Sequence, residues 1–212
     1  EEEGSCSLMY CLRHECDMRE PGPSLSFDRK CPEKLLGLSC LGPARAVGFS
    51  RLWWSWLGSF VGIAIISLLA QYVFDPLFLP SVYGSFGATA VLLYAAPASP
   101  LAQPRNLLMG HTLSAFIGVS LYKCSFVLAP KGELMWITAA LSVSVSIVLM
   151  HMTKSLHPPG GASALIAVIG VPVHAMGYLY VVFVFFGAIL MLLVALLIDN
   201  LPKRQAYPQF WW

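Results

Sequence analysis

The segment from His157 to Ser163 reads His-Pro-Pro-Gly-Gly-Ala-Ser and has the residue types of an anion site. Its two prolines push the residue before each of them out of the helical conformation. Its two glycines let the backbone turn sharply and approach another group closely. We therefore expect a helix to begin at Gly161 or Ala162. The unpaired N–H groups and partly positive end of such a helix favour an anion.

A second stretch repeats this pattern earlier in the chain. Residues 87–92 (Gly-Ala-Thr-Ala-Val-Leu) echo residues 161–166 (Gly-Ala-Ser-Ala-Leu-Ile), so that Thr89 matches Ser163. Short hydrophobic segments interrupted by Gly or Pro in corresponding halves of a membrane protein indicate a transport site. The hypothesis is a site formed by two half-helix N-termini. Its predicted substrate-binding residues are Gly87, Ala88, Thr89, His157, Pro158, Pro159, Gly160, Gly161, Ala162 and Ser163.

The same small residues have a structural interpretation. Tightly packed membrane helices place Gly, Ala, Ser and Thr at their contacts. In that case the two stretches serve packing alone, and the chain is a non-transporting structural or regulatory membrane subunit. A continuous polar cavity between the stretches would favour transport, whereas a dry and fully packed interface would favour the structural role.

Three basic residues near these stretches are candidates for attracting an anion or relaying a proton, because ionisable groups inside membrane segments usually serve function. Arg105 lies in the break after the first stretch, and Lys154 lies shortly before the second. For both, an equally good interpretation is that they only set membrane topology. His111 lies one turn into a long apolar run and could exchange a proton at near-neutral pH. The membrane part has no acidic pair, metal-ligand set or nucleotide-binding fingerprint, so we expect no catalytic residue, cofactor or metal, and no enzyme.

The composition and segment lengths predict how these residues are positioned. The chain is 57% hydrophobic and 11% charged, whereas soluble domains are about 45–50% apolar and about 25% charged. An all-α integral membrane protein is therefore expected. If all three segments of each unit cross the membrane, the second unit enters it from the opposite side. This predicts six transmembrane segments, two of them short, as two inverted repeats. The apolar segments are residues 52–74, 82–96, 106–128, 134–152, 161–170 and 175–198.

Charge placement supports six crossings over the alternative of four, in which the short segments do not span. With either count both termini share a side, the positively charged, cytoplasm-like one, but four crossings would move Arg105 to the opposite side. Residues 1–50 are expected to form a polar, flexible extension, residues 51–204 the transmembrane domain and residues 205–212 a short tail. The extension holds five of the six cysteines, whose wide spacing indicates a zinc site only weakly. The basic residues on the shared side are Arg45, Arg51, Arg105, Lys154, Lys203 and Arg204.

The string from His157 to Leu165 resembles the signature of the HPP family of integral membrane proteins. Residues 97–106, followed by Gly110 and His111, also resemble that family, and the resemblance covers roughly residues 52–200. Plant and algal members are implicated in nitrite transport into plastids across the inner envelope. The resemblance therefore implies transport of a small inorganic anion, nitrite first, in the chloroplast inner envelope, with both termini on the stromal side.

Nitrite is the anion of a weak acid, so His111 or His157 could couple proton and anion movement. Uptake would then rise as the external pH falls. The expected partners are membrane lipid and the small anion, with a homo-oligomer as an option and without nucleic acid.

Overall fold

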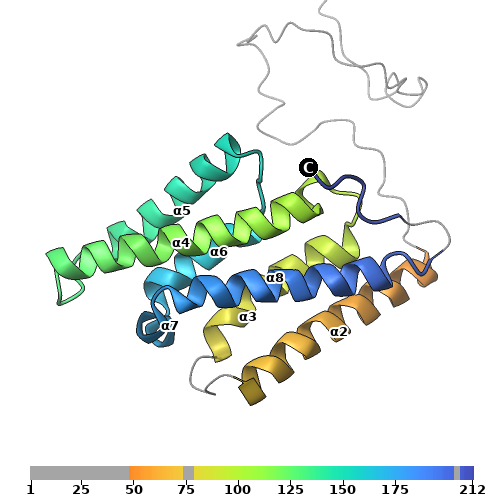
Figure 1. The fold of residues 1–212 in the computed structure, drawn as a ribbon, viewed down its shortest axis with the longest axis horizontal. Helices are drawn as coiled ribbons and strands as arrows, with labels where there is room; N and C mark the ends of the chain where they lie inside the picture. Colours follow the sequence, from red (N-terminus) through yellow and green to blue (C-terminus); the bar gives the residue numbers. More distant parts are fainter. Residues whose placement is uncertain (1–47, 74–78, 203–205) are drawn as a thin grey trace, which may run out of the picture. The chain divides into compact units, whose positions relative to one another are not determined.

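The computed structural model describes residues 48–73, 79–202 and 206–212, which are helices and connecting segments without strands (Figure 1). The all-α prediction is confirmed for these residues, while nearly all of the predicted extension over residues 1–50 lies outside them. The helices are α2 (Phe49–Val73), α3 (Leu79–Ala90), a π-helical turn (Val91–Ala95), a 3₁₀ turn (Pro100–Ala102), α4 (Pro104–Leu128), α5 (Met135–Met152), α6 (Pro158–Ile169), α7 (Val171–Met176) and α8 (Leu179–Ile198).

Four of the described helices, α2, α4, α5 and α8, are long and apolar enough to cross a membrane. A hydrocarbon core of about 30 Å requires about 20 helical residues. The 12 residues of α6 and the 12 residues of α3 fall short of that length. The observed order of long and short helices matches the order of apolar segments in the sequence. The chain is thus an integral membrane protein in which the short helices α3, α6 and α7 lie between the long ones.

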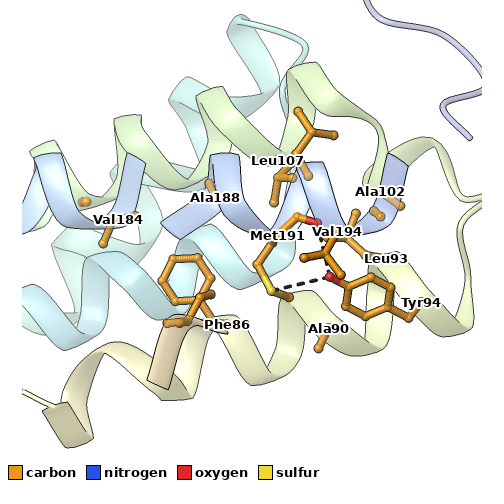
Figure 2. Packing of buried hydrophobic residues seen from close by; sticks show 14 of the residues in the cluster. Phe86, Ala90, Leu93, Tyr94, Ala102, Leu107, Val184, Ala188, Met191 and Val194 are labelled. Carbon is orange, nitrogen blue, oxygen red and sulfur yellow. Dashed lines mark hydrogen bonds between the residues drawn. The ribbon is translucent and has the colours of Figure 1, made fainter. Parts of the chain in front are cut away.

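An apolar core fills the space where α3, α4 and α8 meet (Figure 2). The Tyr94 ring lies in it, and its hydroxyl group donates a hydrogen bond of 3.2 Å to the carbonyl oxygen of Met191. Helix α2 can approach this ring because it presents glycine there: a Cβ atom on Gly58 would lie 2.6 Å from the Tyr94 ring. The core thereby anchors α3 and its π-helical turn between α2 and α8.

Helices α4 and α6 are in backbone contact through glycine. A Cβ atom on Gly160 would lie 2.6 Å from the carbonyl oxygen of Gly110. A Cβ atom on Gly118, two turns further along α4, would lie 2.5 Å from the carbonyl oxygen of Ala164. Small residues at membrane helix contacts permit such close approach. The contact places the N-terminal half of α4 directly against the first turn of α6.

The first predicted helix start is wrong. Gly87 lies inside α3, which begins at Leu79 and continues through Ala90 into the π-helical turn. The physical reason is that a glycine within an apolar run only weakens a helix, whereas Pro80 falls in the first turn, where proline is well tolerated. Residues 87–89 therefore do not form a half-helix N-terminus.

The second helix start lies earlier than predicted. Helix α6 begins at Pro158 rather than at Gly161 or Ala162. His157 precedes it with extended backbone angles (φ −138°, ψ 102°), as expected of a residue before proline. Proline is favoured at the first helical position, since its missing N–H group would be unpaired there in any case. The two glycines accordingly lie within the first turn of α6 rather than before it.

The tail after α8 packs against the segment that precedes α4. The Tyr207 hydroxyl group donates a hydrogen bond of 2.8 Å to the carbonyl oxygen of Ala102. The backbone N–H of Gln209 donates a hydrogen bond of 2.8 Å to the side-chain oxygen of Gln103. Asn200, just beyond α8, holds Tyr207 through its own side chain. Residues 206–212 therefore pack against the transmembrane domain.

Candidate functional site

Four polar side chains with no exposed surface meet where α3, α4 and α6 come together. Thr89 lies on α3, His111 on α4 and Ser163 on α6, while His157 immediately precedes α6. We call these four residues the histidine cluster. Because buried polar groups in a membrane domain need partners, their hydrogen bonds define what the cluster can do.

His111 links the two echoed stretches. Its Nε2 atom lies 2.7 Å from Thr89 Oγ1, and its Nδ1 atom lies 2.8 Å from Ser163 Oγ. Both distances are within the normal range of hydrogen bonds. The equivalent Thr and Ser of the sequence pattern are therefore joined through one imidazole ring, although only Ser163 lies near a helix start.

His157 is held from the other side. Its Nδ1 atom lies 2.9 Å from the carbonyl oxygen of Leu101, in the segment before α4. Its Nε2 atom lies 3.4 Å from Thr89 Oγ1. The His157 and His111 rings are in edge contact, with centroids 4.8 Å apart. Thr89 Oγ1 is also 3.0 Å from the carbonyl oxygen of Ser85, one turn back on α3.

The surroundings of the cluster carry no opposite charge. The Phe86 ring centroid lies 5.1 Å from that of His111, and the Tyr180 hydroxyl group donates to the carbonyl oxygen of Ser163 at 3.1 Å. Among the residues that the structure describes, the acidic side chains are Glu133 and Asp199, and neither makes a hydrogen bond or ion pair with the cluster. A positive charge on either imidazole would thus be buried without a protein partner, which is costly.

The basic residues predicted to attract an anion lie outside the cluster. Arg105 Nη2 donates a 2.7 Å hydrogen bond to the carbonyl oxygen of Thr153, which fixes the loop between α5 and α6. The Nε atom of Arg105 is buried and has no hydrogen-bond partner in the described part of the chain. Lys154 is exposed and has a left-handed backbone, with φ 52°. Their attraction for an anion stays a prediction.

Residues 44–208 match the family described as HPP, transmembrane region. The chain belongs to the HPP family. Two transmembrane proteins of Dictyostelium discoideum are each 44% identical to this HPP chain, over 80% and 75% of its length. The chain spans about half the length of these curated relatives, 54% of one and 55% of the other. No solved structure matches it.

The other predicted site residues of this HPP chain are divided among three surroundings. Gly87 and Ala88 lie on the exposed face of α3, away from the cluster. Pro159 and Gly160 are buried in the first turn of α6, where Gly160 contacts α4. The remaining three border an apolar groove of about 520 Å³ between α5 and α6; they are Pro158, Gly161 and Ala162. Of the ten predicted substrate-binding residues, only Thr89, His157 and Ser163 bring polar side chains together.

Two groups that shape the cluster were absent from the sequence prediction. Tyr180 was missed, although a tyrosine within the strongly apolar α8 is a usable signal, since a buried hydroxyl group needs a partner. The Leu101 carbonyl group has no such signal, because any residue carries one. No three His, Cys, Asp or Glu side chains within the described ranges come together as metal ligands.

Proposed function

We propose that this HPP protein transports a small inorganic anion, nitrite first, across the membrane. The histidine cluster is the observation that carries the proposal. Polar and ionisable side chains buried among membrane-spanning helices are costly and typically mark the path of a substrate or ion. Two hydroxyl groups and two imidazole rings are hydrogen-bond donors in a small space. In the described arrangement they bond one another and nearby carbonyl groups, so a planar anion with two oxygen atoms would bind by replacing some of these contacts. The absence of a contacting carboxylate among the described residues also favours an anion over a cation.

The proposal retains the inverted repeat. In it, α2 to α4 form one repeat and α5 to α8 the other, in opposite orientation, with the substrate site at their junction as in many transporters. The support is that Thr89 and Ser163, one from each echoed stretch, contact the two nitrogen atoms of the same ring. Location in the plastid inner envelope, with stromal termini, belongs to the same proposal and rests on the plant and algal family members.

A second candidate is a non-transporting structural or regulatory subunit. The close backbone contact between Gly110 and Gly160, together with full burial of the cluster, favours it. In that case the polar network would specify one packing arrangement of α3, α4 and α6, as satisfied buried networks do in other proteins.

Nitrite uptake into proteoliposomes distinguishes the two candidates. The purified chain should accumulate nitrite faster than protein-free liposomes. Thr89→Val and Ser163→Ala should each lower uptake by about 5- to 150-fold, because leaving the buried His111 nitrogen unpaired costs about 1–3 kcal/mol and each 1.4 kcal/mol is about a factor of ten. Ser144→Ala is the matched control, since Ser144 is exposed on α5 and bonds only the carbonyl oxygen of Leu141.

Each result has a distinct meaning. A monodisperse wild-type protein that shows no uptake would support the structural candidate. Uptake that is normal in Thr89→Val and Ser163→Ala would retain transport but remove the histidine cluster from its path. Equal losses in Ser144→Ala would show that the assay reports folding rather than the site.

A further inference from the structure

The proton positions in the histidine cluster follow from its hydrogen bonds. A neutral imidazole has one N–H donor and one acceptor nitrogen. The Leu101 carbonyl oxygen can only accept, so the N–H of neutral His157 must be on Nδ1, which faces it at 2.9 Å. The Nε2 atom of His157 is therefore an acceptor, and it points at Thr89 Oγ1.

Thr89 has one hydroxyl proton and more than one acceptor for it. The carbonyl oxygen of Ser85 lies 3.0 Å from Thr89 Oγ1 and can only accept. His157 Nε2, at 3.4 Å, also accepts when neutral. His111 can satisfy its own two contacts in one arrangement, in which Nε2 donates to Thr89 and Nδ1 accepts from Ser163. The contact between Thr89 Oγ1 and His157 Nε2 then has no proton, in agreement with its long distance of 3.4 Å.

We propose that His157 Nε2 is the proton-loading position of the transport cycle, and that one proton enters the cluster with each anion. This inference rests on the proposed function and names its coupling. A proton from water binds the lone pair of His157 Nε2, which then donates to Thr89 Oγ1 and completes every contact of the network. No covalent bond of the anion is made or broken. The proton leaves again when the anion is released on the opposite side of the membrane.

The charges around His157 require an anion to accompany this proton. On α4 the titratable group in contact with His157 is the His111 ring. Of the nearby basic residues, Arg105 bonds the Thr153 carbonyl oxygen and Lys154 is exposed. Helix α3 contributes Thr89, which does not titrate, and α8 contributes Tyr180, which bonds the Ser163 backbone. These groups are neutral or positive, so the described surroundings cannot neutralise an imidazolium. A monovalent anion can, and the loaded cluster is then electrically neutral as a whole.

The hydrogen bonds of the two rings favour His157 over His111 as the residue that takes up the proton. His111 has good partners for both ring nitrogens at 2.7 and 2.8 Å, and each partner is a hydroxyl group that can donate or accept. A second proton on His111 would force both hydroxyl groups to accept. Thr89 could still do so, but its contact with His157 would remain without a proton. The added proton therefore satisfies more contacts on His157.

Proton uptake linked to nitrite binding tests the inference directly. Nitrite is titrated calorimetrically into the full chain in two buffers of different ionisation enthalpy, which gives the number of protons taken up with each anion bound. About one proton per nitrite is expected for wild type and for His174→Gln, and about none for His157→Gln. His174 is a suitable control because it stacks on Tyr122 and bonds the Val168 carbonyl oxygen, away from the cluster. Glutamine can still donate to Leu101 but cannot take up the proton.

Transport adds an independent measurement that does not depend on the variant folding. In wild-type proteoliposomes, nitrite uptake should be unaffected when potassium and valinomycin set the membrane potential, and it should acidify the lumen by one proton per anion above the nitrous acid leak of protein-free vesicles. Nitrite binding or uptake with no linked proton would overturn the inference and leave the proposed function standing. Linkage that is unchanged in a folded His157→Gln protein would overturn the assignment to His157. A wild-type protein that neither binds nor transports nitrite would instead refute the proposed function.

Discussion

Replacing Gly160 by alanine tests the contact that holds the site together. The new Cβ atom would lie 2.6 Å from the Gly110 carbonyl oxygen and 3.0 Å from Ser114 Oγ. The nearer of these atoms belongs to the backbone, which cannot move aside as a flexible side chain can. Real Cβ atoms essentially never lie under 3.0 Å from such atoms, so α4 and α6 must move apart. Overpacking of this kind costs about 1–3 kcal/mol. We expect Gly160→Ala to lower the thermal unfolding midpoint in detergent.

Gly161→Ala is the matched control for this experiment. Its Cβ atom would meet only Val143 Cγ1 at 3.9 Å, which is an ordinary contact. The two residues are neighbours in the first turn of α6, so the gain in helix propensity, up to about 1 kcal/mol, is similar and cancels in the comparison. The difference in stability between the variants therefore isolates the contact with Gly110. It should be about 1–3 kcal/mol, with Gly160→Ala the less stable.

The assay is a thermal unfolding scan of both variants in one detergent and at one protein concentration. For chains of about 150–250 residues, each kcal/mol shifts the midpoint by about 2–4 °C if unfolding is two-state. Equal midpoints for Gly160→Ala and Gly161→Ala would refute the close backbone contact of α4 and α6. A lower midpoint for Gly161→Ala would show that the apolar groove beside α5, rather than the glycine contact, limits stability.

The remaining predictions concern three other positions. Burial raises the pKa of Asp199 from 3.8 to about 7. Its contribution to stability is therefore full below about pH 3.8 and is lost as the pH rises through about 7. Thermal unfolding scans across this pH range should show the loss of stability in wild type and not in Asp199→Asn. Tyr94→Phe should destabilise the fold by about 0.5–1.5 kcal/mol through loss of its hydrogen bond to Met191, whereas Tyr72→Phe, on an exposed residue, should leave the midpoint unchanged. If Lys154 attracts the anion, Lys154→Gln should raise the KM for nitrite uptake at low salt and not at high salt, since Debye screening limits the reach of exposed charges.

The order of the helices could be predicted from the sequence because it depends on the length of apolar runs. A run of about 20 apolar residues is long enough to span the membrane. The Gly and Pro residues within 84–97 and 158–172 interrupt the apolar pattern where the short helices are observed. The residue at which each helix begins was harder to predict. A glycine inside an apolar run was taken as a start at Gly87, although the helix had already begun before Pro80.

The candidate site was only partly predictable. Thr89, His111, His157 and Ser163 were all candidates because polar residues are rare in these segments, and their types could be read directly. The sequence does not predict that Thr89 and Ser163 both contact the His111 ring. This contact depends on the register of α4 against α6, which the glycine contacts set. The sequence pattern also does not show which side of α3 is buried: Gly87 and Ala88 are exposed, while Thr89, the next residue, lies in the cluster.

Three consecutive residues before α4 have a consequence for how the protein can be observed. The Leu101 carbonyl group holds His157, the Ala102 carbonyl group holds Tyr207, and the Gln103 side chain holds the backbone N–H of Gln209. We expect a change at His157 to alter the contacts of the tail through these three residues. Hydrogen exchange at the Gln209 amide, beyond the last spanning helix, would then report whether His157 is loaded or empty without any probe being placed in the membrane.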